Sequence, residues 1–201
     1  RVFLWFTRLS YFDPSLPTSP IYKGADLFFE SLENFVEELK AGDLIVYMGK
    51  HGQDAQKFDR IAKKSDVYQY IRWVDHLDHP DVVTYLSIKN AVVFTQLGVS
   101  VSIPGIGRDG YSIGTPMVNC CTEEGMKAQY TLPGPRIYAK EPAEITSAMS
   151  ALLNMGEEEF ENIRRETALY GEKYIDKSFF LKRLYKEIEN LTCNSNLTLP
   201  S

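Results

Sequence analysis

Short runs of continuous apolar residues alternate along this chain with longer stretches in which apolar residues recur every three or four positions. The short runs are typical of β-strands covered on both faces, and the longer stretches are typical of amphipathic helices. We expect strands in these segments: Val2–Phe6, Leu44–Met48, Val67–Val74, Ala91–Phe94, Met117–Cys120 and Ile137–Ala139. Their alternation with helices predicts an α/β fold, in which helices flank a doubly wound parallel sheet.

The helices expected between these strands are marked by their apolar spacing and by the residues that end them. A stripe from Leu27 to Leu39 predicts a first long helix that ends at Gly42, where glycine suits a left-handed cap. Further helices are expected in these segments: Gln53–Lys64, Pro80–Leu86, Ile145–Met155 and the tail Glu157–Leu191, broken near Asp176–Ser178. Residues 1–201 therefore form one predicted Rossmann-like domain with a helical tail at about 157–191.

Charge and composition restrict the function classes. The net charge is −5, so a nucleic-acid binder, which needs a basic surface, is not expected. Three cysteines give no disulfide framework and favour the cytoplasm, with peripheral contact to a membrane left open. The sequence has no run of 18 apolar residues and no zinc-binding spacing, so we expect no transmembrane helix and no zinc site. Arg1–Phe6 is typical of a strand and not of a signal peptide, which suggests a domain excised from a longer protein.

Candidate ligand-binding residues follow the expected strands, because ligands of doubly wound sheets bind beyond the carboxyl ends of the strands. Arg8 follows the first strand, and Lys23 stands at the start of the first long helix. A helix N-terminus favours an anion, and two added cations suit a diphosphate. The alternative for Lys23 is a solvated residue without a ligand. Gly49 follows the second strand, where it either lets backbone approach a ligand or makes a simple turn.

A glycine-rich stretch in mid-chain contains a literal G-x-G-x-x-G at Gly105, Gly107 and Gly110. A dinucleotide fingerprint should instead close the first strand of a βαβ unit and precede an acid by about 20 residues, so a dehydrogenase is disfavoured. We expect Gly105, Ile106, Gly107 and Arg108 to form a loop that feeds a short helix and cradles phosphate or sugar.

Two further groups have mainly structural interpretations. His76 and His79, with the aspartates around them, are expected to be loop and helix-cap residues, because they lack a regular metal-ligand spacing. The aromatic residues Tyr68, Tyr70 and Trp73 are expected to pack, with a nucleobase site beside Trp73 as the alternative.

Four segments, in this order, resemble the C-terminal domain of GT-B retaining glycosyltransferases, the group that includes glycogen-synthase-like and sucrose-synthase-like enzymes. They are WFTRLSYFDPSLPTSPIYKGADLFFESL, LIVYMGKHGQD, YLSIKNAVVFTQ and GRDGYSIGTPMV, within roughly residues 2 to 155. The order and spacing of the segments carry the resemblance, since each motif alone is loose.

The resemblance implies a role for each matching residue. Arg8 and Lys23 would hold the donor diphosphate, Gly49 would lie near the nucleotide, and Asp109 would bind the ribose hydroxyls. The stretch from Gly105 to Arg108 would approach the phosphate or sugar, and no catalytic residue is identified. The chain departs from the family at Asp109, where glutamate is usual, and at Val101, where the family often has another glutamate. A longer stretch than usual also separates Arg8 from Lys23.

The function that the resemblance implies is binding of a nucleotide-diphosphate sugar for transfer with retention of configuration. The carbohydrate or glycolipid acceptor would be bound by an N-terminal domain outside this chain, so we expect no transfer by the chain alone. The resemblance implies no metal or other cofactor. Two alternatives stay open: a binding or scaffold module that has lost the chemistry, and a GT-B nucleotide-sugar epimerase.

Overall fold

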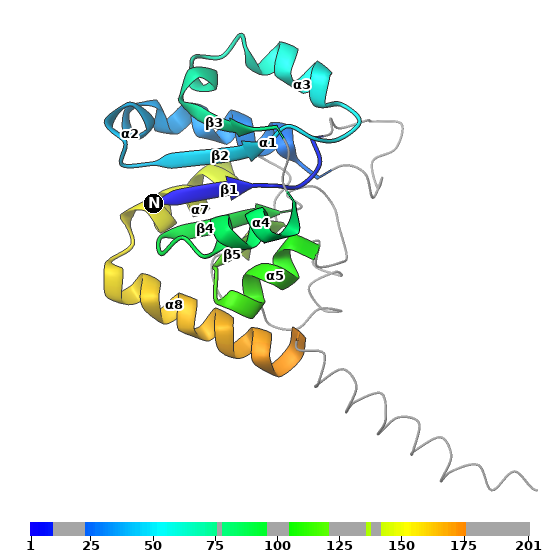
Figure 1. Ribbon diagram of the computed structural model, residues 1–201. Helices are drawn as coiled ribbons and strands as arrows, with labels where there is room; N and C mark the ends of the chain where they lie inside the picture. The colour runs from blue at the N-terminus through cyan, green and yellow to red at the C-terminus, as the bar shows by residue number, and fades with distance from the viewer. Residues whose placement is uncertain (10–22, 76–77, 96–104, 121–135, 138–141, 176–201) are drawn as a thin grey trace, which may run out of the picture.

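The computed structural model describes residues 1–9, 23–75, 78–95, 105–120, 136–137 and 142–175. Six strands form one sheet in the order β3-β2-β1-β4-β5-β6, and every neighbouring pair is parallel (Figure 1). The strands are β1 (Val2–Trp5), β2 (Ile45–Gly49), β3 (Ile71–Val74), β4 (Ala91–Thr95), β5 (Met117–Cys120) and β6 (Arg136–Ile137). The predicted doubly wound α/β fold is confirmed.

Alternate residues of β1 divide the core into two layers. Phe3 and Trp5 point into the larger core, with side chains from α1 (Ala25–Leu32), α2 (Val36–Ala41), α3 (Ala55–Ala62) and α7 (Pro142–Asn154). Leu4 and Phe6 point into the second core, with side chains from α4 (His79–Leu86) and α5 (Gly105–Ile113). Because successive side chains of a strand point to opposite faces, continuous apolar strands are what a sheet covered on both faces requires.

The helix α8 (Glu157–Tyr170) connects the two layers. It contributes Phe160 to the larger core and Tyr170 to the second core, and it lies along α5 (Figure 1). A short π-helical turn, η3 (Gly171–Ile175), follows it. The predicted tail helix is thus confirmed from residue 157 to 170, and residues 176–191 of that prediction lie outside the described residues.

One predicted strand is wrong in its first half. Residues Asp66–Tyr70 form a 3-10 helix, η2, and only Ile71–Val74 joins the sheet. Side-chain hydrogen bonds explain the difference, because the Ser65 hydroxyl accepts from the Val67 N–H and the Tyr68 hydroxyl donates to Asp59. These contacts hold the turn although its residue types favour strands.

The first long helix is interrupted. A 3-10 turn, η1 (Glu33–Phe35), separates α1 from α2, and Phe35 leaves helical geometry at φ −124° and ψ 27°. The second piece ends as predicted at Gly42, which has the left-handed φ of 82°. The last predicted strand is displaced: β6 is Arg136–Ile137, and residues 138–139 lie outside the described residues.

Candidate functional site

The order of the strands places a candidate site at the carboxyl end of β1. The chain moves from β1 to β2 and β3 on one side and places β4 on the other, so the winding reverses between β1 and β4. Ligands of doubly wound sheets bind in the crevice at this reversal. Arg8, three residues beyond the end of β1, is exposed at this point.

Backbone hydrogen bonds join the segment after β1 to the loop after β2. The Leu9 N–H donates to the His51 carbonyl at 2.7 Å, and the Asp54 N–H donates to the Leu9 carbonyl at 3.4 Å. Gly52 fits between them with a φ of +121°, and a Cβ there would lie 2.6 Å from the Leu9 oxygen. Only glycine satisfies both this backbone conformation and this close approach.

The charge of Arg8 acts on two basic side chains from other segments of the chain. Partial burial, and then the Arg8 guanidinium, lower the pKa of Lys23, which lies two residues before α1. The same two causes, in the same order, lower the pKa of His51 in the loop after β2. Arg8 therefore acts electrostatically on Lys23 although fourteen positions, Leu9 to Tyr22, separate them in the sequence. His51, for which we expected no role from the sequence, is affected in the same way.

Gly49 is buried at the end of β2, and its immediate neighbour is a side chain of this protein. A Cβ at Gly49 would lie 3.0 Å from Nδ1 of His51 and 3.6 Å from Cδ1 of Phe6. The missing side chain therefore leaves room for the His51 ring. The expected contact of Gly49 with the nucleotide stays a prediction.

The expected loop at Gly105, Ile106, Gly107 and Arg108 is wrong in its conformation. These residues form the first turn of α5, which begins at Gly105. Ile106 packs against the second core, and Gly110 faces β4, where a Cβ would lie 3.5 Å from Cγ1 of Val93, an ordinary contact distance. The phosphate or sugar contact of this segment stays a prediction.

Asp109, the expected ribose ligand, lies on α5 and is half-buried. Its Oδ2 lies 3.3 Å from Nε2 of His79, at the start of α4. Asp78 caps α4 and Asp81 completes a capping box, so the predicted helix-cap role of this segment is confirmed. His76 and Val101 lie outside the described residues. Among the residues that are described, no group of three or more His, Cys, Asp or Glu could hold a metal ion.

The aromatic residues expected to pack do so. The rings of Tyr68 and Trp73 lie 5.0 Å apart between centroids, and Trp73 also contacts Phe58 of the larger core. The Lys50 ammonium lies 5.2 Å from the Trp73 ring centroid and 3.3 Å from Asp59. Lys50 is therefore engaged in a packed cluster beside β3.

A further polar group at the carboxyl end of β1 was missed by the sequence analysis. Thr7 directly precedes Arg8 and is only 7 % exposed. Its hydroxyl has no hydrogen-bond partner among the residues that the structure describes. The signal in the sequence is a polar residue that directly follows an apolar strand.

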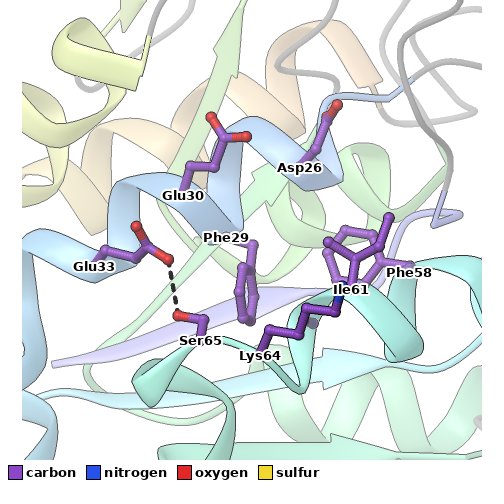
Figure 2. Close-up of a pocket in the computed structure, with 9 residues that line it drawn as sticks. Asp26, Phe29, Glu30, Glu33, Phe58, Ile61, Lys64 and Ser65 are labelled. Carbon is purple, nitrogen blue, oxygen red and sulfur yellow. Dashed lines mark hydrogen bonds between the residues drawn. The ribbon is translucent and has the colours of Figure 1, made fainter.

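A separate pocket of about 500 Å³ lies between α1 and α3 (Figure 2). Phe29 and Phe58 contribute to its apolar part, and on one side of it lie Asp26 and Glu30 of α1 and Glu33 of η1. Partial burial, Asp26 and Glu33 raise the pKa of Glu30. Because this wall is acidic, the pocket repels a diphosphate, and the site at Arg8 is the better candidate for an anion.

Sequence comparisons assign no family to the chain. No protein-family model matches it. The signal recognition particle 54 kDa protein of Archaeoglobus fulgidus is 26 % identical over 177 residues, covering 83 % of this chain and 40 % of that protein. An identity this low does not place the chain in that family.

Solved structures define the fold. An α,α-trehalose-phosphate synthase (UDP-forming) from Burkholderia vietnamiensis matches with a TM-score of 0.63 and 13 % identity, covering 99 % of this chain and 46 % of that protein. The C-terminal domain of a glycosyl transferase group 1 family protein (LpcC) from Francisella tularensis matches with a TM-score of 0.55 and 12 % identity, over 85 % of this chain and 80 % of that domain. The fold is that of a GT-B C-terminal domain.

The share of each matched protein that the chain covers agrees with a single GT-B domain fold. The chain spans less than half the length of the trehalose-phosphate synthase and most of the isolated LpcC domain. Identities of 12–13 % establish the arrangement of sheet and helices, and the activity has to be argued from the site. Within the described part of the GT-B domain, no helix has both the length and the apolar character needed to cross a bilayer.

Proposed function

We propose that this chain binds a nucleotide-diphosphate sugar and forms the donor-binding half of a retaining glycosyltransferase. The observation that carries the proposal is the position of Arg8 at the winding reversal, where its charge acts on both Lys23 and His51. A cluster of cationic groups raises its own electrostatic energy, and a bound anion relieves that energy. A diphosphate supplies two negative charges that would offset the positive charge of this cluster.

The chemistry of sugar transfer explains why these groups are useful. When the bond between the anomeric carbon and the donor oxygen breaks, the nucleoside diphosphate leaves with the electron pair and gains negative charge. The Arg8 guanidinium can hold two phosphate oxygens at once, and the Lys23 ammonium adds a second cation at the amino end of α1. These groups therefore stabilise the leaving group most strongly as it departs.

The acceptor half is proposed to lie outside this chain. The chain matches less than half of the trehalose-phosphate synthases, and it resembles an isolated C-terminal domain. We therefore expect donor binding without sugar transfer by these 201 residues alone. Configuration retained at the anomeric carbon belongs to the same proposal, because it is a property of the group that the sequence resembles.

Calorimetry with nucleotide sugars tests the proposal. We expect UDP-glucose, GDP-glucose or ADP-glucose to bind, and Arg8→Ala to weaken that binding by about 1.5–3 kcal/mol, roughly 10- to 150-fold in Kd. UDP-glucose is the first ligand to try, because the trehalose-phosphate synthase with the same fold is UDP-forming.

A matched control is Arg60→Ala, which removes an exposed arginine from α3. It should leave the Kd unchanged, because α3 begins beyond the loop that carries His51. Absence of binding for all three nucleotide sugars at millimolar concentration would contradict donor binding. Equal Kd values for Arg8→Ala and the unchanged chain would remove Arg8 from the site.

A further inference from the structure

The His51 ring is held at the candidate diphosphate site by the backbone around it. The His51 carbonyl accepts the Leu9 N–H at 2.7 Å, which fixes the backbone of His51 beside the segment that carries Arg8. The next residue, Gly52, lies so close to Leu9 that a Cβ at Gly52 would also contact Cβ of Arg8 at 3.3 Å. This hydrogen bond therefore holds the backbone of His51 beside Leu9, the residue that follows Arg8.

Gly49 determines the position of the ring itself. A Cβ at Gly49 would lie 3.0 Å from Nδ1 and 3.3 Å from Cε1 of His51, which is tighter than ordinary carbon contact. The ring thus lies over the end of β2, and the side chain remains exposed to solvent. An exposed imidazole that packs on the last residue of a strand, next to an arginine, is placed to reach a ligand at the carboxyl edge.

The charged groups around His51 determine what kind of ligand favours it. Arg8 opposes protonation of the ring, and Arg8 acts in the same way on Lys23. Lys50, in the same loop, is engaged by Asp59 and Tyr68, and Asp54 follows at the cap of α3. An anion bound between Arg8 and His51 reverses the repulsion and favours the charged imidazolium.

We propose that His51 is a third residue of the diphosphate site, which gains a proton when the nucleotide sugar binds and then donates a hydrogen bond to a phosphate oxygen. This inference rests on the proposed function and adds to it a direct contact of His51 with a phosphate oxygen and the uptake of a proton on binding. Its consequence is that donor binding becomes tighter as the pH falls through the range in which histidine titrates.

The experiment measures the Kd of UDP-glucose by calorimetry between pH 7.5 and pH 5.5. The diphosphate of a nucleotide sugar carries no terminal phosphate that titrates near pH 6, so a change in Kd reports on the protein. We expect the Kd to fall roughly three- to tenfold over this range. In His51→Gln, which keeps a side-chain N–H but cannot titrate, the Kd should change by less than about twofold.

A second readout separates a direct contact from a structural role. The ring protons of His51, assigned in NMR spectra by comparison with His51→Gln, give the pKa of His51 in the free and the UDP-glucose-bound chain. Binding should raise this pKa by about one unit or more. A histidine that only shapes the loop would show the same pKa in both states.

The outcomes distinguish the inference from the proposed function. If no nucleotide sugar binds, or if Arg8→Ala binds as well as the unchanged chain, the proposed function fails. If binding depends on Arg8 but His51→Gln keeps the full pH dependence, the inference alone is overturned. Loss of the pH dependence in His79→Gln instead would assign the proton to the pair of His79 and Asp109 and would also overturn it.

Discussion

Asp59 on α3 is an example of how one carboxylate organises several side chains. It pairs with Lys63 at 2.6 Å, accepts from the Tyr68 hydroxyl at 2.6 Å and lies 3.3 Å from Lys50. These partners, Lys63 first and Tyr68 second, lower the pKa of Asp59 to about 2 from an ordinary value of 3.8. A carboxyl group that has a lower pKa in the folded chain than in the unfolded chain stabilises the fold at pH values above the pKa of the unfolded chain.

At the scale of a single residue, we predict that Asp59→Asn lowers the free energy of unfolding by about 1–2 kcal/mol at pH 6. This range allows for the screening of the Asp59 charge by solvent. In the unchanged chain this stabilisation is lost as the pH falls from about 4 to about 2, so the difference should shrink by pH 3. Urea denaturation at pH 6 and pH 3 measures both values. The exposed Asp43→Asn is the control, with an expected change within about 0.5 kcal/mol. A difference that is equal at the two pH values would contradict the assignment to the Asp59 charge.

At the scale of elements, the contact of α8 and α5 depends on one glycine. A Cβ at Gly171, at the end of α8, would lie 2.2 Å from the carbonyl oxygen of Tyr111. The two helices also meet through the rings of Tyr111 and Tyr170, 5.0 Å apart between centroids. The helices can approach this closely only because residue 171 has no side chain.

This contact predicts that Gly171→Ala destabilises the protein by about 1–3 kcal/mol. The sign of this change is informative. Replacing glycine by alanine at a helical position normally stabilises a protein by about 1 kcal/mol, whereas here we expect a loss. Thermal unfolding of Gly171→Ala should be compared with that of Gly156→Ala, where a Cβ would meet nothing within 4 Å. The loss at Gly156, a helix N-cap, should not exceed about 1 kcal/mol. A Gly171→Ala protein as stable as the unchanged chain would show that α8 shifts easily on α5.

The elements also show what the sequence can and cannot predict. The buried strands could be predicted because apolar runs such as Ala91–Phe94 have few other uses. Val67–Tyr70 was wrongly predicted to be a strand because hydrogen bonds with the side chains of Ser65, two positions before Val67, and of Asp59 on α3 override its residue preferences. Gly105–Arg108 was wrongly predicted to be a loop because glycine disfavours helices, yet these residues form the first turn of α5.

The candidate site could be predicted from the sequence only in part. Topology alone places Arg8 and Lys23 at one edge, because parallel strands share their carboxyl ends. The position of His51 depends instead on a backbone contact with Leu9 and on the space left by Gly49. Such contacts exist only in the folded chain, and residue types do not encode them in a recognisable spacing.

At the scale of the whole molecule, the Arg1 side chain joins the start of the sheet to the junction of α7 and α8. Its Nε donates to the Leu152 carbonyl at 3.0 Å, its Nη1 pairs with Glu157 at 2.9 Å and its Nη2 donates to the Met155 carbonyl. The guanidinium also lies 4.3 Å from the centroid of the Phe160 ring. The side chain is only 6 % exposed, so these contacts replace nearly all of its water.

We expect Arg1→Met to lower the free energy of unfolding by about 2–4 kcal/mol, because it leaves buried carbonyls without donors. Methionine keeps most of the apolar volume, so the loss reports on the hydrogen bonds and the charge. Chemical denaturation measures it, with Lys40→Met as the control. Lys40 pairs with Glu37 on an exposed helix surface, and its loss should cost clearly less than the loss of Arg1. Equal stability of the two variants would show that the Arg1 contacts contribute little.

The Arg1 contacts also set an order of events during synthesis. Arg1 and Glu157 are separated by 156 positions, so the ribosome must make most of the chain before the two can meet. Until then the nascent β1 can pair with β2 and β4, which emerge before Glu157, while the Arg1 side chain just before β1 has not yet met its partners. Contacts of such long range are slow to form, and the last step of folding should be the closure of α8 over an already paired sheet.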